Sequence, residues 1–138
     1  MKNADNTTHK SYFCTPTHSF KYSEHKPQKY MPSILVTCYS RTGKTKALAE
    51  AIGRGAKTVD GINVEVLSFN RISASDLVRY DGIVLGSPVY FGGVAAELKE
   101  LIDDTTFVRG KLVGKVGAAF TTAGDRTGGK ETAILSIV

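Results

Sequence analysis

The sequence predicts an α/β domain built on a parallel sheet, and three observations indicate this fold class. From residue 33 onward, apolar runs alternate with segments of helical periodicity, which is the pattern of repeated strand–helix units. Several of these runs end in loops rich in Gly, Ser or Thr. The chain has 138 residues, 41% of them hydrophobic, which suffices for one domain with one core. The domain is therefore expected to span residues 33–138.

Residues 1–32 are expected to form a disordered leader, because they lack periodicity and are rich in Thr, Ser, Lys and His. Their five lysines and two acidic residues give +3 of the net charge of +5, so the domain itself is only slightly basic. This distribution argues against a nucleic-acid-binding function. The sequence has two cysteines, no signal-peptide pattern and no apolar run long enough to span a membrane. A reduced, cytoplasmic setting is expected.

The first strand is predicted over residues 34–39 and the first helix over residues 43–57. In this helix, apolar residues recur at helical spacing, which predicts a stripe that faces the core. The residues of this stripe are Leu48, Ala51, Ile52 and Ala56.

The second strand, residues 62–66, alternates apolar and polar residues and is expected at an edge of the sheet. Ser73 and Asp76 have the spacing of a capping box, which predicts a short helix that continues to Tyr80. The continuous apolar run at residues 83–86 predicts the third, buried strand.

A third helix is predicted over residues 95–103, with Leu98, Leu101 and Ile102 directed inward. The fourth strand is predicted over residues 116–120. Residues 132–138 have the pattern of the first turns of another helix.

Residues 40–45 connect the first strand to the first helix, where phosphates commonly bind. A helix start offers unpaired backbone N–H groups and the positive end of the helix dipole. Three hydroxyl side chains add possible donors, and a glycine allows the backbone to approach an anion closely. A plain helix cap after a strand is the competing interpretation. The candidate phosphate ligands are Ser40, Arg41, Thr42, Gly43, Lys44 and Thr45.

Spacing separates three kinds of phosphate loop here. A nucleoside-triphosphatase P-loop needs a glycine where Cys38 stands. A cysteine-phosphatase loop needs an arginine six residues after the nucleophilic cysteine, and Lys44 stands there instead. The third kind is the hydroxyl-rich loop Ser/Thr-x-Thr-Gly-x-Thr of flavodoxins, which the segment matches at every fixed position.

Two further loops follow the third and fourth strands. Residues 87–93 contain two adjacent aromatic residues and two glycines, which suit the binding of a planar ring at the carboxyl end of a parallel strand. Residues 121–132 contain three glycines and four threonines, more than a turn requires. Such a loop could surround a polar ring edge with backbone N–H groups. A hydrophobic plug at the end of the sheet is the alternative for the first of these loops.

The three loops, in this order, resemble those of the flavodoxin-like, WrbA-type NAD(P)H:quinone oxidoreductases. The similarity covers residues 33–138 and includes the segments 81–92 and 128–132. It implies a three-layer α/β sandwich with strand order 2-1-3-4, bound FMN, and NAD(P)H and a quinone as substrates. It also implies that the flavin performs the chemistry, so that no side chain is a catalytic acid or base and no metal is needed.

The resemblance assigns further residues to the cofactor beside the phosphate loop. Those implied beside the isoalloxazine are Pro88, Val89, Tyr90, Phe91 and Gly92, and those implied at its polar edge are Thr122, Gly124, Gly128 and Gly129.

The sequence also departs from this family. A flavodoxin-like sheet has five strands, and the fifth strand and its helix are missing here, so a fragment or completion by another chain, including a homo-oligomer, is expected. The domain also lacks a histidine near the ring. A flavodoxin-type electron carrier and a cofactor-free interaction module are the alternatives. The carrier is disfavoured because such proteins are strongly acidic, whereas this domain is slightly basic.

Overall fold

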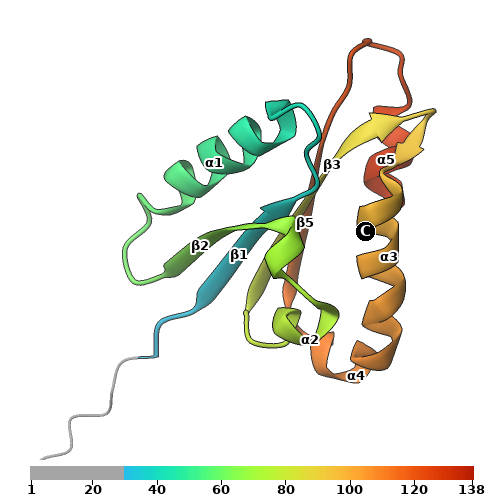
Figure 1. The fold of residues 1–138 in the computed structure, drawn as a ribbon. Helices are drawn as coiled ribbons and strands as arrows, with labels where there is room; N and C mark the ends of the chain where they lie inside the picture. Colours follow the sequence, from blue (N-terminus) through green and yellow to red (C-terminus); the bar gives the residue numbers. More distant parts are fainter. Residues whose placement is uncertain (1–29) are drawn as a thin grey trace, which may run out of the picture.

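The computed structural model describes residues 30–138. The prediction that the leader is disordered concerns residues 1–32, of which 1–29 lie outside the described residues. The described part alternates strands and helices as the sequence predicts (Figure 1). Its strands are β1 (Ser33–Cys38), β2 (Asn63–Ser68), β3 (Gly82–Tyr90), β4 (Gly93–Val94) and β5 (Val116–Thr122). Its helices are α1 (Lys44–Ala56), α2 (Ala74–Leu77), α3 (Ala96–Asp104), α4 (Arg109–Leu112) and α5 (Lys130–Leu135), with short 3-10 turns η1 (Phe69–Arg71) and η2 (Thr105–Phe107).

The sheet has the order β2-β1-β3-β5, and all these neighbours are parallel. This is the predicted order 2-1-3-4, because the fourth predicted strand is β5, and it confirms the flavodoxin-like sandwich. The short β4 pairs antiparallel with the end of β3. Strands β2 and β5 form the two edges of the parallel part, so the edge position expected for β2 is confirmed.

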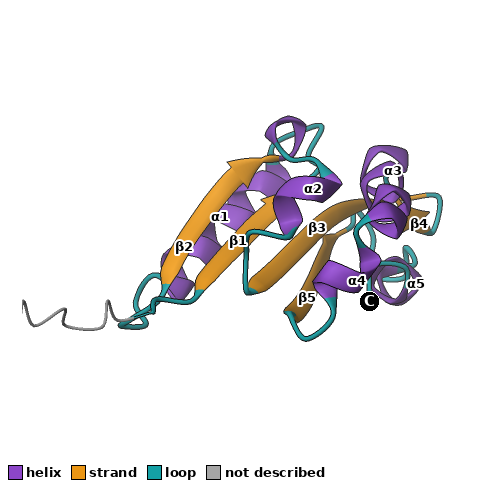
Figure 2. Ribbon diagram, turned by 90° about the horizontal axis from the view of Figure 1, so that it is seen from below, coloured by secondary structure: helices purple, strands orange, loops and turns teal. Residues whose placement is uncertain are grey.

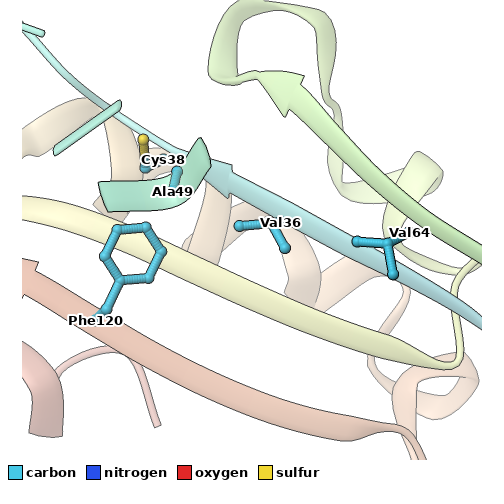
Figure 3. Packing of buried hydrophobic residues seen from close by; sticks show 5 residues of the cluster. All are labelled: Val36, Cys38, Ala49, Val64 and Phe120. Carbon is cyan, nitrogen blue, oxygen red and sulfur yellow. The ribbon is translucent and has the colours of Figure 1, made fainter. Parts of the chain in front are cut away.

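Helices cover both faces of the sheet, with α1 on one side and α2, α3 and α4 on the other (Figures 1 and 2). Alternate residues of β1 supply the two cores, since successive side chains of a strand point to opposite faces. Val36 and Cys38 pack on the α1 side with Ala49 and Phe120 (Figure 3). On the other side, Leu35 packs with Leu77 and Tyr80, and the predicted inward residues of α3, Leu98 and Leu101, are buried.

The predicted core-facing stripe of α1 is wrong at two positions. Leu48 is 38% exposed and Ala51 is also exposed, whereas Thr45, Ala49 and Gly53 are buried. A Cβ atom at Gly53 would lie 2.2 Å from Cγ2 of Val66 on β2. The helix therefore approaches the sheet most closely along its small residues, and this close approach turns Leu48 outward.

The third strand is longer than predicted. It continues to Tyr90, because residues 82–88 pair with β5 and residues 89 and 90 pair with β4. The segment expected to be a loop from residue 87 therefore begins as strand, and only Phe91 and Gly92 form the tight turn before β4. The strand pairing holds Pro88 and Val89 in a fixed backbone register.

The capping box predicted at the start of α2 is present, and it is expected to make the stability of the fold depend on pH. The Asp76 carboxylate accepts hydrogen bonds from the Ser73 hydroxyl at 2.6 Å and the Ser73 backbone N–H at 3.0 Å. These bonds hold the pKa of Asp76 below its ordinary value of 3.8. A lowered folded-state pKa stabilises the fold above the unfolded-state pKa, and this contribution disappears as the pH falls through the folded value.

Asp76→Asn is therefore expected to lower the melting temperature at pH 7, and the deficit should shrink as the solution becomes acidic enough to protonate Asp76 in the native protein. Thermal unfolding of both proteins between pH 7 and pH 2 measures this difference. Asp60→Asn is the control, because Asp60 is exposed. A deficit that is constant across the pH range would contradict the role of the carboxylate.

Candidate functional site

The predicted phosphate loop lies between β1 and α1, at the carboxyl end of the sheet (Figure 1). Gly43 is the N-cap of α1 and has a φ of 85°, a left-handed conformation that favours glycine. The Ser40 hydroxyl accepts a hydrogen bond from the backbone N–H of Lys46 at 3.2 Å. The loop is thus wrapped around the first turn of α1, whose first N–H groups have no partner within the helix.

Thr45 connects this loop to β5. Its side chain is only 2% exposed, and its Oγ1 lies 2.8 Å from Oγ1 of Thr122 at the end of β5. The two hydroxyls come from residues 77 positions apart in the sequence. Each hydroxyl can both donate and accept, so this pair keeps further capacity to hydrogen-bond a ligand.

The loops after β3 and β5 contact each other through two glycines. A Cβ atom at Gly129 would lie 2.6 Å from the Cα atom of Gly92, so the two backbones meet where no side chain fits. Gly92 and Gly129 have φ angles of 83° and 84°. Phe91, the residue before Gly92, is fully exposed and has a φ of 49°, which is uncommon for a bulky residue.

The three loops enclose a recess with a volume of about 210 Å³. Nine of the lining residues were expected from the sequence, and the tenth, Ala123, was missed although it stands between two expected residues. The recess is lined by Arg41, Thr42, Lys44, Thr45, Pro88, Val89, Tyr90, Thr122, Ala123 and Gly124.

Six predicted residues lie beside this recess and do not line it. Ser40 faces a neighbouring cavity, and Gly43 shapes the helix start. Phe91 is exposed at the tip of the β3–β4 turn. Gly92 and Gly129 hold the two outer loops together, while Gly128 lies against Ala123, with 3.7 Å between an added Cβ and the Ala123 Cβ.

Tyr39, which the sequence analysis did not single out, lies between the recess and this neighbouring cavity. Its ring makes edge-to-face contacts with Tyr90 of the recess, at a centroid distance of 6.5 Å, and with Phe69, at 6.0 Å. The neighbouring Glu97 carboxylate raises the pKa of Tyr39. Tyr39 directly precedes the hydroxyl-rich loop. An aromatic residue at that position is the sequence signal by which Tyr39 could have been found.

Cys38 is 8% exposed at the end of β1, next to the phosphate loop. Burial, together with the charge of Glu50, raises the pKa of its thiol to about 11. The thiol is therefore protonated at neutral pH, and the thiolate is the form that acts as a nucleophile. This finding agrees with the rejection of a cysteine-phosphatase loop on spacing.

Within residues 30–138, no three His, Cys, Asp or Glu side chains gather in a way that could hold a metal ion. In the same part of the chain, no helix has both the length and the apolar character needed to cross a membrane.

Comparison with known proteins places this architecture in a class. Residues 73–136 match the family model described as NADPH-dependent FMN reductase. A solved flavodoxin, WrbA-like protein from Agrobacterium tumefaciens superposes with a TM-score of 0.65 at 23% identity, over 77% of this chain and 69% of that chain. A flavodoxin from the domain Archaea superposes with a TM-score of 0.59 at 33% identity, over 68% of this chain and 64% of that chain. The protein thus has the flavodoxin-like fold.

Curated relatives with two kinds of name are similar in sequence. A flavodoxin from Aquifex aeolicus (strain VF5) is 34% identical over 109 residues, which are 78% of this chain and 59% of the relative. An NAD(P)H dehydrogenase (quinone) 3 from Rhizobium meliloti (strain 1021) is 36% identical over 127 residues, with coverage of 77% and 60%. The chain therefore spans about 60% of the length of these relatives. The names of these relatives, flavodoxin and NAD(P)H dehydrogenase (quinone), describe those proteins.

Proposed function

We propose that this chain binds FMN in the recess between its three loops and takes part in two-electron reduction of a quinone by NAD(P)H, as a WrbA-type protein. The single observation that carries the proposal is the convergence of these loops. Segments 41–45, 88–90 and 122–124 are distant in sequence and meet at the carboxyl ends of β1, β3 and β5. Open parallel sheets bind their ligands at this edge, near the point where the strand order reverses.

The donor set fits the phosphate of FMN. Arg41 and Lys44 supply positive charge, and the hydroxyls of Thr42 and Thr45 are possible donors on the same wall of the recess. Thr122 adds a hydroxyl from the end of β5, 2.8 Å from that of Thr45. The recess volume is below the 300–1,000 Å³ typical of pockets that enclose a ligand, so a flavin would extend beyond it, towards Tyr90 and Phe91.

The residues of this chain would hold and orient the flavin, and the flavin would supply the redox chemistry. FMN, when bound, allows a hydride from NAD(P)H, with a proton from water, to reduce a quinone to a quinol. Strand pairing fixes the backbone of Pro88 and Val89, which are the residues proposed to lie beside the ring. The contact between Gly92 and Gly129 keeps the two ring loops together. Thr45 and its neighbours hold the phosphate end, which fixes the position of the ring along the recess.

Thr45→Ala tests the phosphate assignment. A hydrogen bond to a charged group contributes about 1.5–3 kcal/mol, so FMN affinity is expected to fall by about ten-fold or more. Riboflavin lacks the phosphate, so its affinity should be low in both proteins and change little. Fluorescence titration of each flavin measures these affinities.

Two matched variants accompany this test. Thr45→Ser keeps the hydroxyl and should retain most of the FMN affinity, and Thr106→Ala removes an exposed threonine of η2 far along the chain. Equal losses for FMN and riboflavin in Thr45→Ala would reject the phosphate site.

The similarity to proteins named flavodoxin favours a second candidate, an electron carrier without a substrate of its own. The two functions differ in a simple assay. An FMN-loaded oxidoreductase oxidises NAD(P)H when a quinone is added, whereas a carrier does so only when a separate reductase is present.

A further inference from the structure

A cavity of about 720 Å³ opens on the other side of the phosphate loop. It lies at the carboxyl ends of β1 and β2 and is walled by α1, η1 and the first turn of α3. Its volume falls within the range typical of small-molecule sites. The flavin site proposed above does not use this cavity, because the lining residues of the two hollows are different.

The cavity and the recess share one thin wall. Ser40 lines the cavity and the next residue, Arg41, lines the recess, so the backbone at residues 40 and 41 is part of the wall between the two hollows. Tyr39 lines the cavity and contacts Tyr90 of the recess edge-on. A long ligand could therefore reach both hollows by crossing residues 39–41.

The charges change sign across this wall. Arg41 and Lys44 line the recess, whereas Glu50 and Glu97 line the cavity with Lys46. Lys46 lies 3.9 Å from Glu50, so these two charges largely offset each other and leave Glu97 as the excess charge. The interaction with Tyr39 keeps the pKa of the Glu97 carboxyl below its ordinary value, so it is ionised at neutral pH.

Carboxylates and positive side chains favour different parts of a ligand. A carboxylate accepts hydrogen bonds from the hydroxyl groups of a ribose, and it repels a phosphate on the same ribose. Positive side chains at the crossing suit a diphosphate. The order of these features matches a dinucleotide whose free ribose lies near Glu97. Its diphosphate would share Arg41 with the FMN phosphate, since a guanidinium has five N–H donors and can bond two anionic groups.

We infer that this cavity is a subsite for the adenosine end of the nicotinamide dinucleotide and that its carboxylates make the protein prefer NADH to NADPH. This inference rests on the proposed function, since it names the reductant of the same flavin site. The aromatic residues Tyr39 and Phe69 provide apolar surface for the adenine, and Asn70 and Ser68 provide amide and hydroxyl groups for its polar edge.

The direct test uses ADP-ribose, which has the adenosine diphosphate part of NADH but cannot transfer hydride. Calorimetric titration of the full chain, with and without FMN, should show ADP-ribose binding at least ten-fold more tightly than ADP-ribose 2′-phosphate. Glu97→Gln should weaken ADP-ribose several-fold and reduce the discrimination, and Glu50→Gln should act in the same direction. Glu100→Gln, an exposed change on α3, should have no effect.

The kinetic test uses the FMN-loaded protein. Glu97→Gln should raise KM for NADH and lower KM for NADPH, while kcat and FMN affinity stay within about two-fold, since the cavity holds only the non-reacting end of the dinucleotide. Equal binding of the two ADP-ribose forms, or unchanged discrimination in both Glu→Gln variants, would overturn the inference. Failure to bind FMN would instead reject the proposed function, and the ADP-ribose titrations without FMN would still decide the subsite.

Discussion

Replacing Gly86 by alanine is expected to lower the free energy of unfolding by about 1–3 kcal/mol, the usual range for an overpacked core. Gly86 lies in the middle of β3, directly opposite Phe120 of β5. A Cβ atom at Gly86 would lie 2.1, 2.4 and 2.6 Å from three ring atoms of Phe120. Figure 3 shows this ring in the core on the α1 side of the sheet, where it is 9% exposed. Each kcal/mol corresponds to about 4–8 °C in the melting temperature of a small domain.

Two further variants show whether the loss of stability comes from the contact with Phe120 or would follow from any glycine replacement in these strands. Gly117→Ala changes a glycine of β5 whose added Cβ meets nothing within 4 Å, so it should unfold at nearly the wild-type temperature. Phe120→Leu made in the Gly86→Ala background should recover part of the loss, because the smaller side chain leaves room for the methyl group. With Phe120→Leu in the wild-type background as a further variant, thermal unfolding of the wild type, the two single variants and the double variant gives the coupling energy of Gly86 and Phe120. If Gly86→Ala is as stable as the wild type, Phe120 is not held over this position.

Replacing Gly129 by alanine is expected to weaken FMN binding by ten-fold or more. A left-handed alanine costs about 1–2 kcal/mol, and at Gly129 the added methyl group would also lie 2.6 Å from the backbone of Gly92. Backbone cannot move aside as a flexible side chain can, so the two loops that flank the proposed ring site must separate. FMN titration measures the affinity, and thermal unfolding without FMN measures the cost to the fold.

Gly114→Ala is the matched control for this change. Gly114 has a φ of 85°, nearly that of Gly129, but an added Cβ there meets nothing within 4 Å, and it does not line the recess. Both variants should lose stability through the strained backbone, and only Gly129→Ala should lose FMN affinity. An equal loss of affinity in both would show that the contact with Gly92 does not position the ring loops.

The sequence predicted the features that depend on local order along the chain. The alternation of strands and helices, the hydroxyl-rich loop and the small residues after β3 and β5 follow from periodicity and from loop composition, which neighbouring residues determine. The strand order was instead implied by the resemblance to the flavodoxin-like family. The stripe of α1 was predicted incorrectly because helical spacing identifies a broad arc of the helix surface. Which part of that arc meets the sheet depends on Gly53 against Val66, a contact between distant residues.

The second cavity was not predicted for a similar reason. Its lining comes from α1, two strand ends, η1 and α3, and only the folded arrangement brings Lys46, Phe69 and Glu97 together. None of these residues stands in a pattern that indicates a ligand. Tyr39 could have been noticed beside the phosphate loop, but its contacts with Phe69 and Tyr90 depend on where three separate strands end.

The position of Tyr39 also has a thermodynamic consequence. Its ring contacts Tyr90 of the recess and Phe69 of the second cavity, so occupation of either hollow changes the surroundings of the same side chain. If a ligand in one hollow alters the free energy of the other through Tyr39, the effect is reciprocal: each ligand changes the affinity of the other by the same factor. The two affinities would then not be independent constants of the protein, and each would have to be measured at a stated concentration of the other ligand.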